Sequence, residues 1–310
     1  MKKILVTGGA GFIGSHIDEA LLSAGHAVTV VDNLSTGKKE NLPRGAKLLR
    51  ADICDTRKML EIFRKEKPAA VIHLAAQMNV RHSILDPAND ATVNILGSIS
   101  ILRACAESGV KRVVVASSGG AVYGDQPPYP CTEKTSPLPD SPYAIAKLSL
   151  EHYSRYFAQN GGASFVALRL SNVYGPRQNP KGEAGVISIF LDRMLAGTTP
   201  VIFGDGSHTR DYVWVGDVAD AFLRALRGPS GIYNIGTGIE TTTLSVYRMV
   251  RDLVGFTPDA RHGPPVHGEV DRNALDCRLA RRRLKWAPRV KLRDGLERLV
   301  RYMGIGAPKA

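Results

Sequence analysis

The sequence predicts an α/β protein with a doubly wound parallel sheet, the Rossmann arrangement, followed by a smaller C-terminal α/β lobe. Two observations carry this prediction. Short β-branched apolar runs alternate with helix-length segments through the first half of the chain, and a glycine-rich loop follows the first run. Right-handed crossovers then place helices on both faces of the sheet. We expect residues 1–170 to bind a cofactor and residues 171–310 to bind a substrate, with elements around 212–238 packing back onto the first domain.

The strands of the first half are short runs rich in Val, Ile and Leu, expected at residues 4–7, 27–31, 47–50, 70–74, 112–116 and 164–168. Helix-length segments lie between most of them, at residues 11–23, 56–65, 88–108 and 142–160. Beyond about residue 170, glycine and proline cluster, which favours long loops around a binding site. Shorter elements are expected there, with helices at 186–196, 215–226 and 244–254 and strands at 201–203 and 233–235.

The composition narrows the class of protein. The 310 residues, 44% hydrophobic and 23% charged, are typical of a globular protein. No apolar run reaches the roughly 18 residues that span a membrane, and the apolar run after Met1 is too short for a signal peptide. The cysteines lack CxxC spacing, so we expect no metal, no disulfide framework and a cytoplasmic location. They are Cys54, Cys105, Cys131 and Cys277.

The formal net charge of +12 raises the question of an anionic partner. Nucleic acid is not expected, because no module of interleaved basic and aromatic residues occurs. The densest basic cluster, residues 278–285, is typical of a solvated helix face. The same positive field would attract a small substrate that carries phosphate.

A glycine-rich loop joins the first predicted strand to the first predicted helix in ILVTGGAGFIG. Glycine lets the backbone approach a pyrophosphate closely, and the helix N-terminus offers free N–H groups at the positive end of its dipole. Because this spacing lies within a strand–loop–helix–strand unit, it indicates a dinucleotide site. The loop residues expected to hold the cofactor are Gly8, Gly11, Phe12, Ile13 and Gly14.

Asp32 ends the second predicted strand, where a carboxylate accepts hydrogen bonds from an adenosine ribose. A carboxylate there disfavours a 2′-phosphate, so the sequence predicts NAD rather than NADP, although Lys38 and Lys39 follow closely. Further residues at the carboxyl ends of predicted strands are expected to line the adenine and the dinucleotide. They are Asn33, Asp52, Ile53, Leu74, Ala75 and Ala76.

Tyr143 and Lys147 lie one helical turn apart in SPYAIAKLSLEHY, so they share a helix face. To act as a base near neutral pH, a tyrosine needs its anion favoured by about 3 pKa units, or roughly 4 kcal/mol. A lysine one turn away and a cationic nicotinamide ring provide stabilisation of that kind. The alternative is a surface Tyr–Lys pair, and the glycine loop favours the catalytic interpretation.

With these motifs the chain resembles the NAD-dependent epimerase/dehydratase family of the extended short-chain dehydrogenase/reductase superfamily, over almost its whole length. The resemblance rests on TGGAGFIGSH, VVDNLSTG, HLAAQ, VNILGS, VYG, SPYAIAK, SNVYGPR, GDGSHTRDYVWVGDVA and YNIGTG. It implies inversion at C4 of a UDP-hexose through a transient 4-keto sugar, with a bound NAD that is reduced and reoxidised in each turnover. N-acetylated hexoses stay open as substrates. The family often forms homodimers through two long helices, here residues 88–108 and 142–160.

The resemblance also implies roles for individual residues. Tyr143 would take the proton of the sugar 4-hydroxyl, Lys147 would hold the nicotinamide ribose, and Asn94 would lie beside the cofactor. In the second lobe, Asn172 and Arg210 match contacts to the substrate diphosphate, which a guanidinium binds in two-pronged fashion. The remaining substrate positions are Val186, Ile187, Glu269 and Asn273.

Three positions depart from the family pattern. Val266 stands where the family often has an arginine, so His267 or another arginine would replace that phosphate contact. Asn273 occupies the position whose size helps to decide whether an N-acetyl group fits. Counting back from Val122-Tyr123-Gly124 places the family's catalytic Ser/Thr at Gly119, and glycine cannot relay a proton.

Three replacements for that relay stay open. Ser118 is adjacent, although consecutive side chains of a strand point to opposite faces. Ser117 would point to the same strand face as Gly119, but it lies two residues earlier, roughly 6.6 Å away at about 3.3 Å per residue, and would act through water. The substrate hydroxyl could also reach Tyr143 directly. We expect Tyr143 to be the direct base, helped by Ser117 or Ser118.

The same stretch separates this chain from related activities. Sugar-nucleotide 4,6-dehydratases need an acid pair where this sequence has Gly120 and Ala121, and decarboxylating relatives usually keep a glutamate there. Another sugar-nucleotide epimerase or reductase is an alternative function. A further alternative is an NAD-binding sensor without catalysis, which need not retain Tyr143, Lys147 and Arg210 together.

Overall fold

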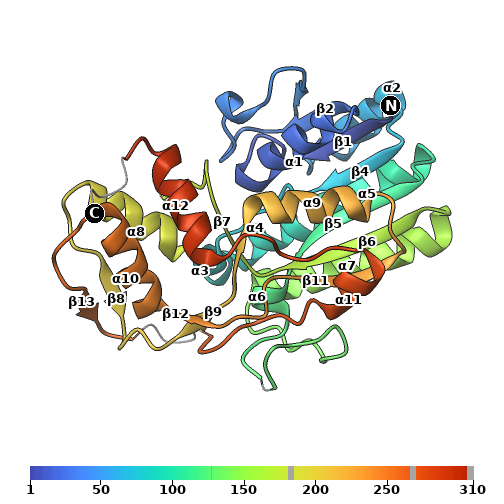
Figure 1. Ribbon diagram of the computed structural model, residues 1–310. Helices are drawn as coiled ribbons and strands as arrows, with labels where there is room; N and C mark the ends of the chain where they lie inside the picture. The colour runs from blue at the N-terminus through green and yellow to red at the C-terminus, as the bar shows by residue number, and fades with distance from the viewer. Residues whose placement is uncertain (127, 181–184, 266–269, 306–310) are drawn as a thin grey trace.

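A seven-stranded parallel sheet forms the centre of the protein in the computed structural model, which describes residues 1–126, 128–180, 185–265 and 270–305 (Figure 1). The strand order is β11-β6-β5-β4-β1-β2-β3, and every pairing is parallel. The strands are β1 (Lys3–Thr7), β2 (Ala27–Asp32), β3 (Lys47–Arg50), β4 (Ala70–His73), β5 (Arg112–Ser118), β6 (Ser164–Leu170) and β11 (Gly231–Ile235). The predicted doubly wound sheet is confirmed, and its order reverses between β1 and β4, where such folds bind ligands.

Helices cover both faces of this sheet, which explains the continuous apolar runs of its strands. Val6 and Val30 face one core and Leu5 and Val31 face the other, following the two-residue period of a strand. The first core is closed by α1 (Phe12–Ser23), α9 (Val215–Ala225) and α11 (Arg278–Arg283). The second is closed by α2 (Thr56–Glu66), α5 (Gly97–Glu107) and α7 (Pro142–Gly161). The short helix α6 (Gly119–Val122) follows β5 directly.

The single helix predicted over residues 88–108 is wrong in detail. The chain instead forms α4 (Pro87–Ala91), a π-helical turn η2 (Thr92–Leu96) and then α5. A π turn inserts one residue into a helix, and such turns often occur at functional sites. A short helix that the sequence did not predict, α3 (Val80–Leu85), precedes them and is capped by the Asn79 side chain, which accepts from the His82 N–H at 2.6 Å.

The second lobe is built from α8 (Val186–Leu195), α10 (Thr243–Val254) and α12 (Leu292–Tyr302), which enclose their own apolar core and lie together in Figure 1. Short strand pairs complete it, namely β8 (Val201–Phe203) with β13 (Arg261–Gly263) and β9 (Thr209–Arg210) with β12 (Thr241–Thr242). A third pair, β7 (Asn172–Tyr174) with β10 (Tyr212–Trp214), follows directly from β6. In the first half of the chain, a 3-10 turn, η1 (Lys39–Asn41), lies between β2 and β3.

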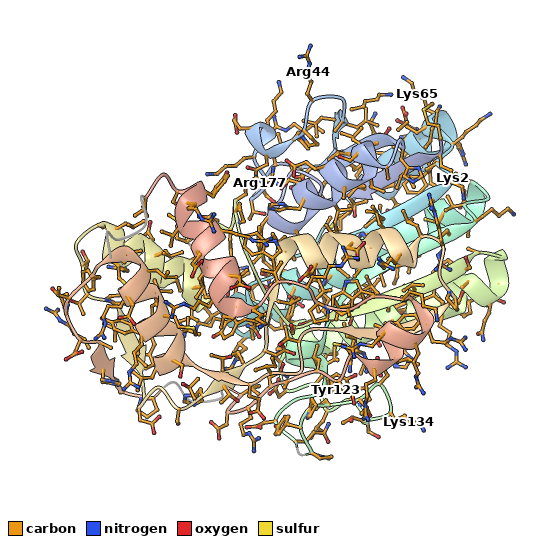
Figure 2. The ribbon with its side chains drawn as sticks, in the orientation of Figure 1. Lys2, Arg44, Lys65, Tyr123, Lys134 and Arg177 are labelled. Atoms are coloured by element: carbon orange, nitrogen blue, oxygen red, sulfur yellow. The ribbon has the colours of Figure 1, made fainter. Side chains whose placement is uncertain are left out.

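Arg177 ties the second lobe to the first helix. It follows β7, and its guanidinium donates to both oxygens of Glu19 on α1, at 2.6 and 2.9 Å. The neighbouring carbonyl of Pro176 is hydrogen-bonded to Nε2 of His16 at 3.0 Å. Figure 2 shows Arg177 beside α1. The helix that carries the glycine loop is therefore anchored to the loop that leaves β7.

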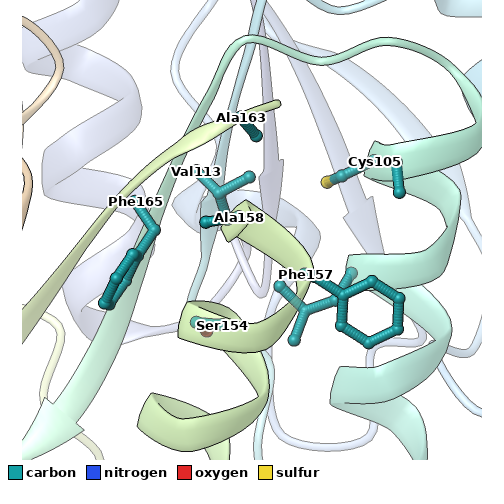
Figure 3. A pocket seen from close by; sticks show the side chains of 9 residues that line it. Cys105, Val113, Ser154, Phe157, Ala158, Ala163 and Phe165 are labelled. Carbon is teal, nitrogen blue, oxygen red and sulfur yellow. The ribbon is translucent and has the colours of Figure 1, made fainter. Parts of the chain in front are cut away.

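A hollow of about 10 Å³ lies between α5, α7 and the amino ends of β5 and β6 (Figure 3). This volume holds at most one water molecule. The hollow lies at the edge of the sheet opposite the glycine loop, so it is no substrate site. Its lining is Leu102, Cys105, Ala106, Val113, Ser154, Phe157, Ala158, Ala163 and Phe165.

No helix in the described ranges is both long enough and apolar enough to cross a lipid bilayer. All four cysteines are free thiols.

Asp18 on α1 is buried under the glycine loop, and neither of its carboxylate oxygens has a hydrogen-bond partner among the described residues. Its Oδ2 lies 2.6 Å from the point that a Cβ on Gly9 would occupy. Burial, with the nearby charges of Asp32 and Glu19, raises the pKa of Asp18 from 3.8 to about 8. An unpaired buried carboxyl group is destabilising.

Replacing Asp18 by valine is expected to raise the free energy of unfolding by about 2 kcal/mol at pH 7. The unfolded chain releases the Asp18 proton at a lower pH than the folded chain, so the wild-type protein loses stability as pH rises from about 4 to about 8. Denaturant unfolding across this range should show the advantage of D18V growing with pH. The near-isosteric D18N should remove the pH-dependent part only. An advantage that stays constant from pH 5 to 8 would contradict the assignment.

Candidate active site

The glycine loop brings the ends of β1 and β4 into contact. Gly8 has φ +72°, a left-handed conformation that glycine adopts readily, and its N–H donates to the Val31 carbonyl at 2.9 Å. A Cβ on Gly8 would lie 2.7 Å from the backbone nitrogen of Ala75. Leu74 and Ala75 both donate to the Thr7 carbonyl, at 3.1 and 3.2 Å. These contacts place the predicted loop and the predicted stretch after β4 side by side.

The first turn of α1 follows this loop and presents backbone donors. Gly11 is its N-cap residue, and no described side chain caps it. The first helical hydrogen bond runs from the Ser15 N–H to the Gly11 carbonyl, at 3.1 Å. The N–H groups of Phe12, Ile13 and Gly14 therefore stand at the positive end of the helix dipole, where an anion binds favourably.

Three of the predicted polar residues meet at the ends of β2 and β3. The Asp32 carboxylate accepts the N–H of Ala10 at 3.0 Å and that of Leu34 at 2.8 Å, which closes the glycine loop over the strand. Asn33 donates to Asp52 at 2.9 Å. Ile53 is different, because its side chain is buried in the core with α2 and α5.

A buried polar chain runs beneath these strand ends. The Thr7 hydroxyl lies 2.7 Å from Nδ1 of His73, Nε2 of His73 lies 3.0 Å from the Ser98 hydroxyl, and Ser98 donates to the Asn94 carbonyl at 2.6 Å. Burial lowers the pKa of His73 to about 3, so its ring is neutral. Sequence reasoning missed this chain, whose only signal is a histidine and a threonine at the ends of apolar strands.

Asn94 lies in the π turn with its side chain fully engaged. Its Oδ1 accepts the Gln77 N–H at 2.9 Å, and its Nδ2 donates to the Gln77 carbonyl and to Oδ1 of Asp90, both at 2.8 Å. Asn94 therefore holds the backbone that follows Leu74–Ala76 at the strand edge.

Tyr143 and Lys147 stand on one face of α7, with Nζ of Lys147 5.7 Å from the centre of the Tyr143 ring. Nζ donates to the Ala116 carbonyl at 3.2 Å, which fixes it against the end of β5. Burial lowers the pKa of Lys147 to about 8, against the opposing effect of the Asp90 charge. The Tyr143 N–H donates to the buried Ser83 hydroxyl at 3.2 Å, so α3 holds the start of α7.

The stretch at the end of β5 resolves into three different environments. Ser117 is buried and donates to Oε1 of Glu151 at 2.5 Å. Gly119 faces the core, since a Cβ there would lie 2.5 Å from Cδ1 of Leu275. Ser118 is half-buried. A Cβ on Gly120 would lie 3.8 Å from the Ser118 hydroxyl and 3.7 Å from Oδ1 of Asn172, so these two polar groups flank Gly120. The hydroxyl on the side of Asn172 is therefore that of Ser118, whereas a side chain at Gly119 would meet Leu275.

A buried ionic network lies behind this stretch. Glu151 and Arg169 form a two-pronged ion pair at 2.7 and 2.9 Å, and Arg169 also donates to the Tyr123 hydroxyl at 2.8 Å. Tyr123 in turn donates to Asn234 at 2.8 Å. This network links α7 to β6 and β11, and through Ser117 to the end of β5.

The predicted substrate residues Asn172, Arg210 and Asn273 converge on short strands and loops of the second lobe. The Asn172 N–H donates to the carbonyl of the buried Asp211 at 2.9 Å. The Asp211 carboxylate accepts the Gly238 N–H at 2.9 Å, which fixes the strand that carries Arg210. Asn273 is buried and its Nδ2 donates to the Gly119 carbonyl at 3.1 Å, so it contacts the turn after Ser118.

The other predicted substrate residues lie differently. Ile187 is buried in the core of the second lobe and Val186 is half-buried at the start of α8, so the Ile187 side chain is a packing residue. Glu269, Val266 and His267 lie outside the described residues. No cluster of metal-ligand type occurs in the part of the chain that the structure describes.

Comparison with known proteins is consistent with this geometry. The model of the NAD dependent epimerase/dehydratase family matches residues 4–236. A putative UDP-glucose 4-epimerase of Methanocaldococcus jannaschii is 45% identical, over 97% of this chain and 98% of the relative. The solved UDP-glucose 4-epimerase of Thermotoga maritima with UDP-glucose superimposes with a TM-score of 0.96 at 45% identity, covering 97% of this chain and 98% of that one. The Thermus thermophilus UDP-glucose 4-epimerase in complex with NAD gives a TM-score of 0.94 at 44% identity, covering 97% and 99%.

Proposed function

Because the chain belongs to the NAD-dependent epimerase/dehydratase family, we propose that it interconverts UDP-glucose and UDP-galactose by inverting C4 of the hexose, with NAD as its resident cofactor. The observation that carries this proposal is the full-length likeness to UDP-glucose 4-epimerases in a chain that has both the glycine loop and the Tyr143–Lys147 pair.

The residues at the strand ends fit NAD. Gly8 packs on the backbone of Ala75 with no room for a Cβ, and the first turn of α1 that follows this loop has N–H donors that would hold a diphosphate. The remaining lone pairs of the Asp32 carboxylate are available to ribose hydroxyls. NAD, when bound, supplies a hydride acceptor that returns the hydride within the same turnover.

The proton chemistry is assigned to the chain itself. Tyr143 accepts the proton of the sugar 4-hydroxyl and returns it at the end of the reaction. The Lys147 cation, held against the Ala116 carbonyl, favours the tyrosinate and holds the nicotinamide ribose. In the second lobe, Arg210 and Asn172 bind the substrate diphosphate, and Asn273 borders the sugar.

Ser118 is the better candidate for a hydroxyl between substrate and Tyr143, because the Ser117 hydroxyl is engaged by Glu151. Ser118→Ala is expected to lower kcat about 10²-fold. Ser117→Ala should leave kcat close to wild type and lower the free energy of unfolding by about 1 kcal/mol, through loss of its hydrogen bond. Steady-state kinetics and denaturant unfolding of the two variants check this. If S118A turns over like the wild type, the substrate hydroxyl reaches Tyr143 without a serine.

The assembly and cell compartment complete the proposal. Leu96 and the α7 residues Ile145, Tyr153 and Tyr156 leave an apolar face exposed, at 59%, 50%, 39% and 58%. A homodimer that buries this face of α7 and the adjoining turn would remove it from water, and the mass of the protein in solution checks it.

Free thiols are compatible with a cytoplasmic enzyme. We also propose that residues 1–170 form a cofactor domain and residues 171–310 a substrate domain, with β11 and α9 packed on the cofactor domain.

Incubating the purified protein with UDP-galactose and no added NAD tests the proposed function. Formation of UDP-glucose is the expected result, because NAD is retained through each turnover. Net accumulation of NADH would instead indicate a dehydrogenase. Absence of conversion across UDP-, dTDP- and GDP-hexoses, N-acetylated ones included, would indicate an NAD-binding protein without epimerase activity.

A further inference from the structure

Asp90 is a buried carboxylate next to the reaction site. It lies on α4 with 1% of its surface exposed, and its Oδ1 accepts the side-chain amides of Gln77 and Asn94, both at 2.8 Å. Its Oδ2 is also buried and has no hydrogen-bond partner among the described residues. A carboxylate placed in this way is unfavourable unless a nearby positive charge offsets the loss of hydration.

That positive charge is Lys147. Lys147 is 6% exposed, and its ammonium group donates to a neutral carbonyl, that of Ala116. Within the described part of the chain, Asp90 is the acid whose charge raises the pKa of Lys147, against the lowering effect of burial. Burial raises the pKa of Asp90, while its hydrogen bonds to Gln77 and Asn94 and the Lys147 charge act in the opposite direction and favour the ionised form.

The other titratable groups around this pair come from α3, β4 and α7. His82 on α3 also favours the ionised form of Asp90. His73 on β4 is buried and neutral, so it brings no charge to Lys147. On α7, Tyr143 is the proposed base, and Glu151 is committed to Arg169 in a buried ion pair. Asp90 therefore remains as the counter-charge for Lys147.

The π turn and its hydrogen bonds fix Asp90 in this position. Asn94 bonds both the Asp90 carboxylate and the backbone of Gln77, and the Gln77 amide also donates to the Asn79 carbonyl at 2.9 Å. The same acid thus holds two side chains at the strand edge, and its helix α4 packs against α7, which carries Lys147.

We propose that Asp90 is a positioning residue of the reaction site, which keeps Lys147 in its cationic form and fixes Asn94 and Gln77 at the edge of the cofactor site. This inference rests on the role proposed above for Lys147. Asp90 acts through Lys147 and contacts neither substrate nor reacting atoms. Its charge is the essential property, because an uncharged amide of the same shape would keep the two hydrogen bonds to its Oδ1.

The direct test is a titration of Lys147 in the NAD-bound protein. Lysine residues labelled with ¹³C at Cε are followed by NMR from pH 6 to 11, and the Lys147 signal is assigned by its loss in Lys147→Met. Asp90→Asn is expected to lower the pKa of Lys147 by about one unit. Glu107→Gln, which removes an exposed carboxylate from α5, serves as the matched control and should leave the Lys147 signal unchanged. An unchanged Lys147 titration in Asp90→Asn overturns the inference.

The kinetic counterpart is the pH profile of kcat. In Asp90→Asn the alkaline limb should move toward lower pH by about one unit, so that kcat at pH 9 falls about tenfold. At pH 6.5, kcat and KM should stay close to wild type, which a merely structural defect would not produce. Asp90→Glu should restore the alkaline limb. A uniform loss of kcat at every pH, with no displacement of the limb, contradicts the inference.

The two proposals fail separately. If the wild-type protein does not convert UDP-galactose but Asp90→Asn still lowers the Lys147 pKa, the proposed function is wrong and the Asp90–Lys147 coupling stands. If the wild-type enzyme is active and the Lys147 titration is the same in both proteins, the coupling is wrong. Should Asp90→Asn fail to fold, Asp90→Ser, which also removes the charge, is titrated in its place.

Discussion

Replacing Tyr143 by phenylalanine is expected to lower kcat for UDP-galactose by about 10²–10⁴-fold, with the fold and the bound cofactor retained. The Tyr143 phenol is the group proposed to take the proton, and Nζ of the buried Lys147 lies 5.7 Å from the centre of its ring. Its backbone N–H is bonded to Ser83, and this bond is independent of the hydroxyl, so the helix start should stay in place. Conversion of UDP-galactose and NAD released on denaturation are the two measurements.

Tyr153→Phe provides the matched control. Tyr153 lies on the same helix, is exposed and belongs to the face proposed for the dimer, so removal of its hydroxyl should leave kcat close to wild type. Retention of more than a tenth of wild-type kcat in Tyr143→Phe would contradict the role of Tyr143 as base and would favour Ser118 with water.

The sheet and the glycine loop were predictable because their signals are local. The apolar runs of β1 and β2, and the glycines that follow β1, depend on contacts within one strand–helix–strand unit. The cofactor role expected for the stretch after β4 rests on the rule that ligands bind at the carboxyl edge of a doubly wound sheet. Leu74 and Ala75 lie against Gly8 at that edge.

The buried polar contacts could not be predicted in the same way. Thr7, His73 and Ser98 come from β1, β4 and α5, and only the folded sheet brings them together. Asp90 has no signal in the sequence that separates it from a solvated helix residue. The π turn that directs Asn94 toward Gln77 inserts one extra residue into the helix. The spacing of apolar residues in the sequence does not reveal an insertion of one residue.

The surroundings of Gly119 show a further limit. Counting back from Val122-Tyr123-Gly124 fixes a position in the sequence but not the direction in which a side chain there would point. In the structure, β5 continues through Ser118, and Gly119 begins α6 with Leu275 against its Cα. The direction of a side chain depends on where its strand ends. The sequence predicted a strand that ends at residue 116, whereas β5 ends two residues later, at Ser118.

Replacing Arg169 by methionine is expected to lower the free energy of unfolding by about 3–5 kcal/mol. Arg169 is buried and binds both oxygens of Glu151, whose surface is equally inaccessible, so the variant leaves a carboxylate in the interior without its counter-charge. The Tyr123 hydroxyl loses a donor as well. Urea unfolding at a fixed, saturating NAD concentration measures the loss, and Arg155→Met, an exposed arginine on α7, is the control that should change little.

The double variant Arg169→Met with Glu151→Leu separates the two parts of this effect. If the loss comes from the stranded carboxylate, removing that carboxylate should recover most of it, because an apolar pair of similar volume is compatible with a buried site. If the double variant is as unstable as Arg169→Met, the network stabilises the fold through its geometry instead. Ser117 loses its acceptor when Glu151 is replaced, as it loses its hydroxyl in Ser117→Ala, so the recovered protein should keep a kcat close to wild type if Ser118 is the hydroxyl beside Tyr143.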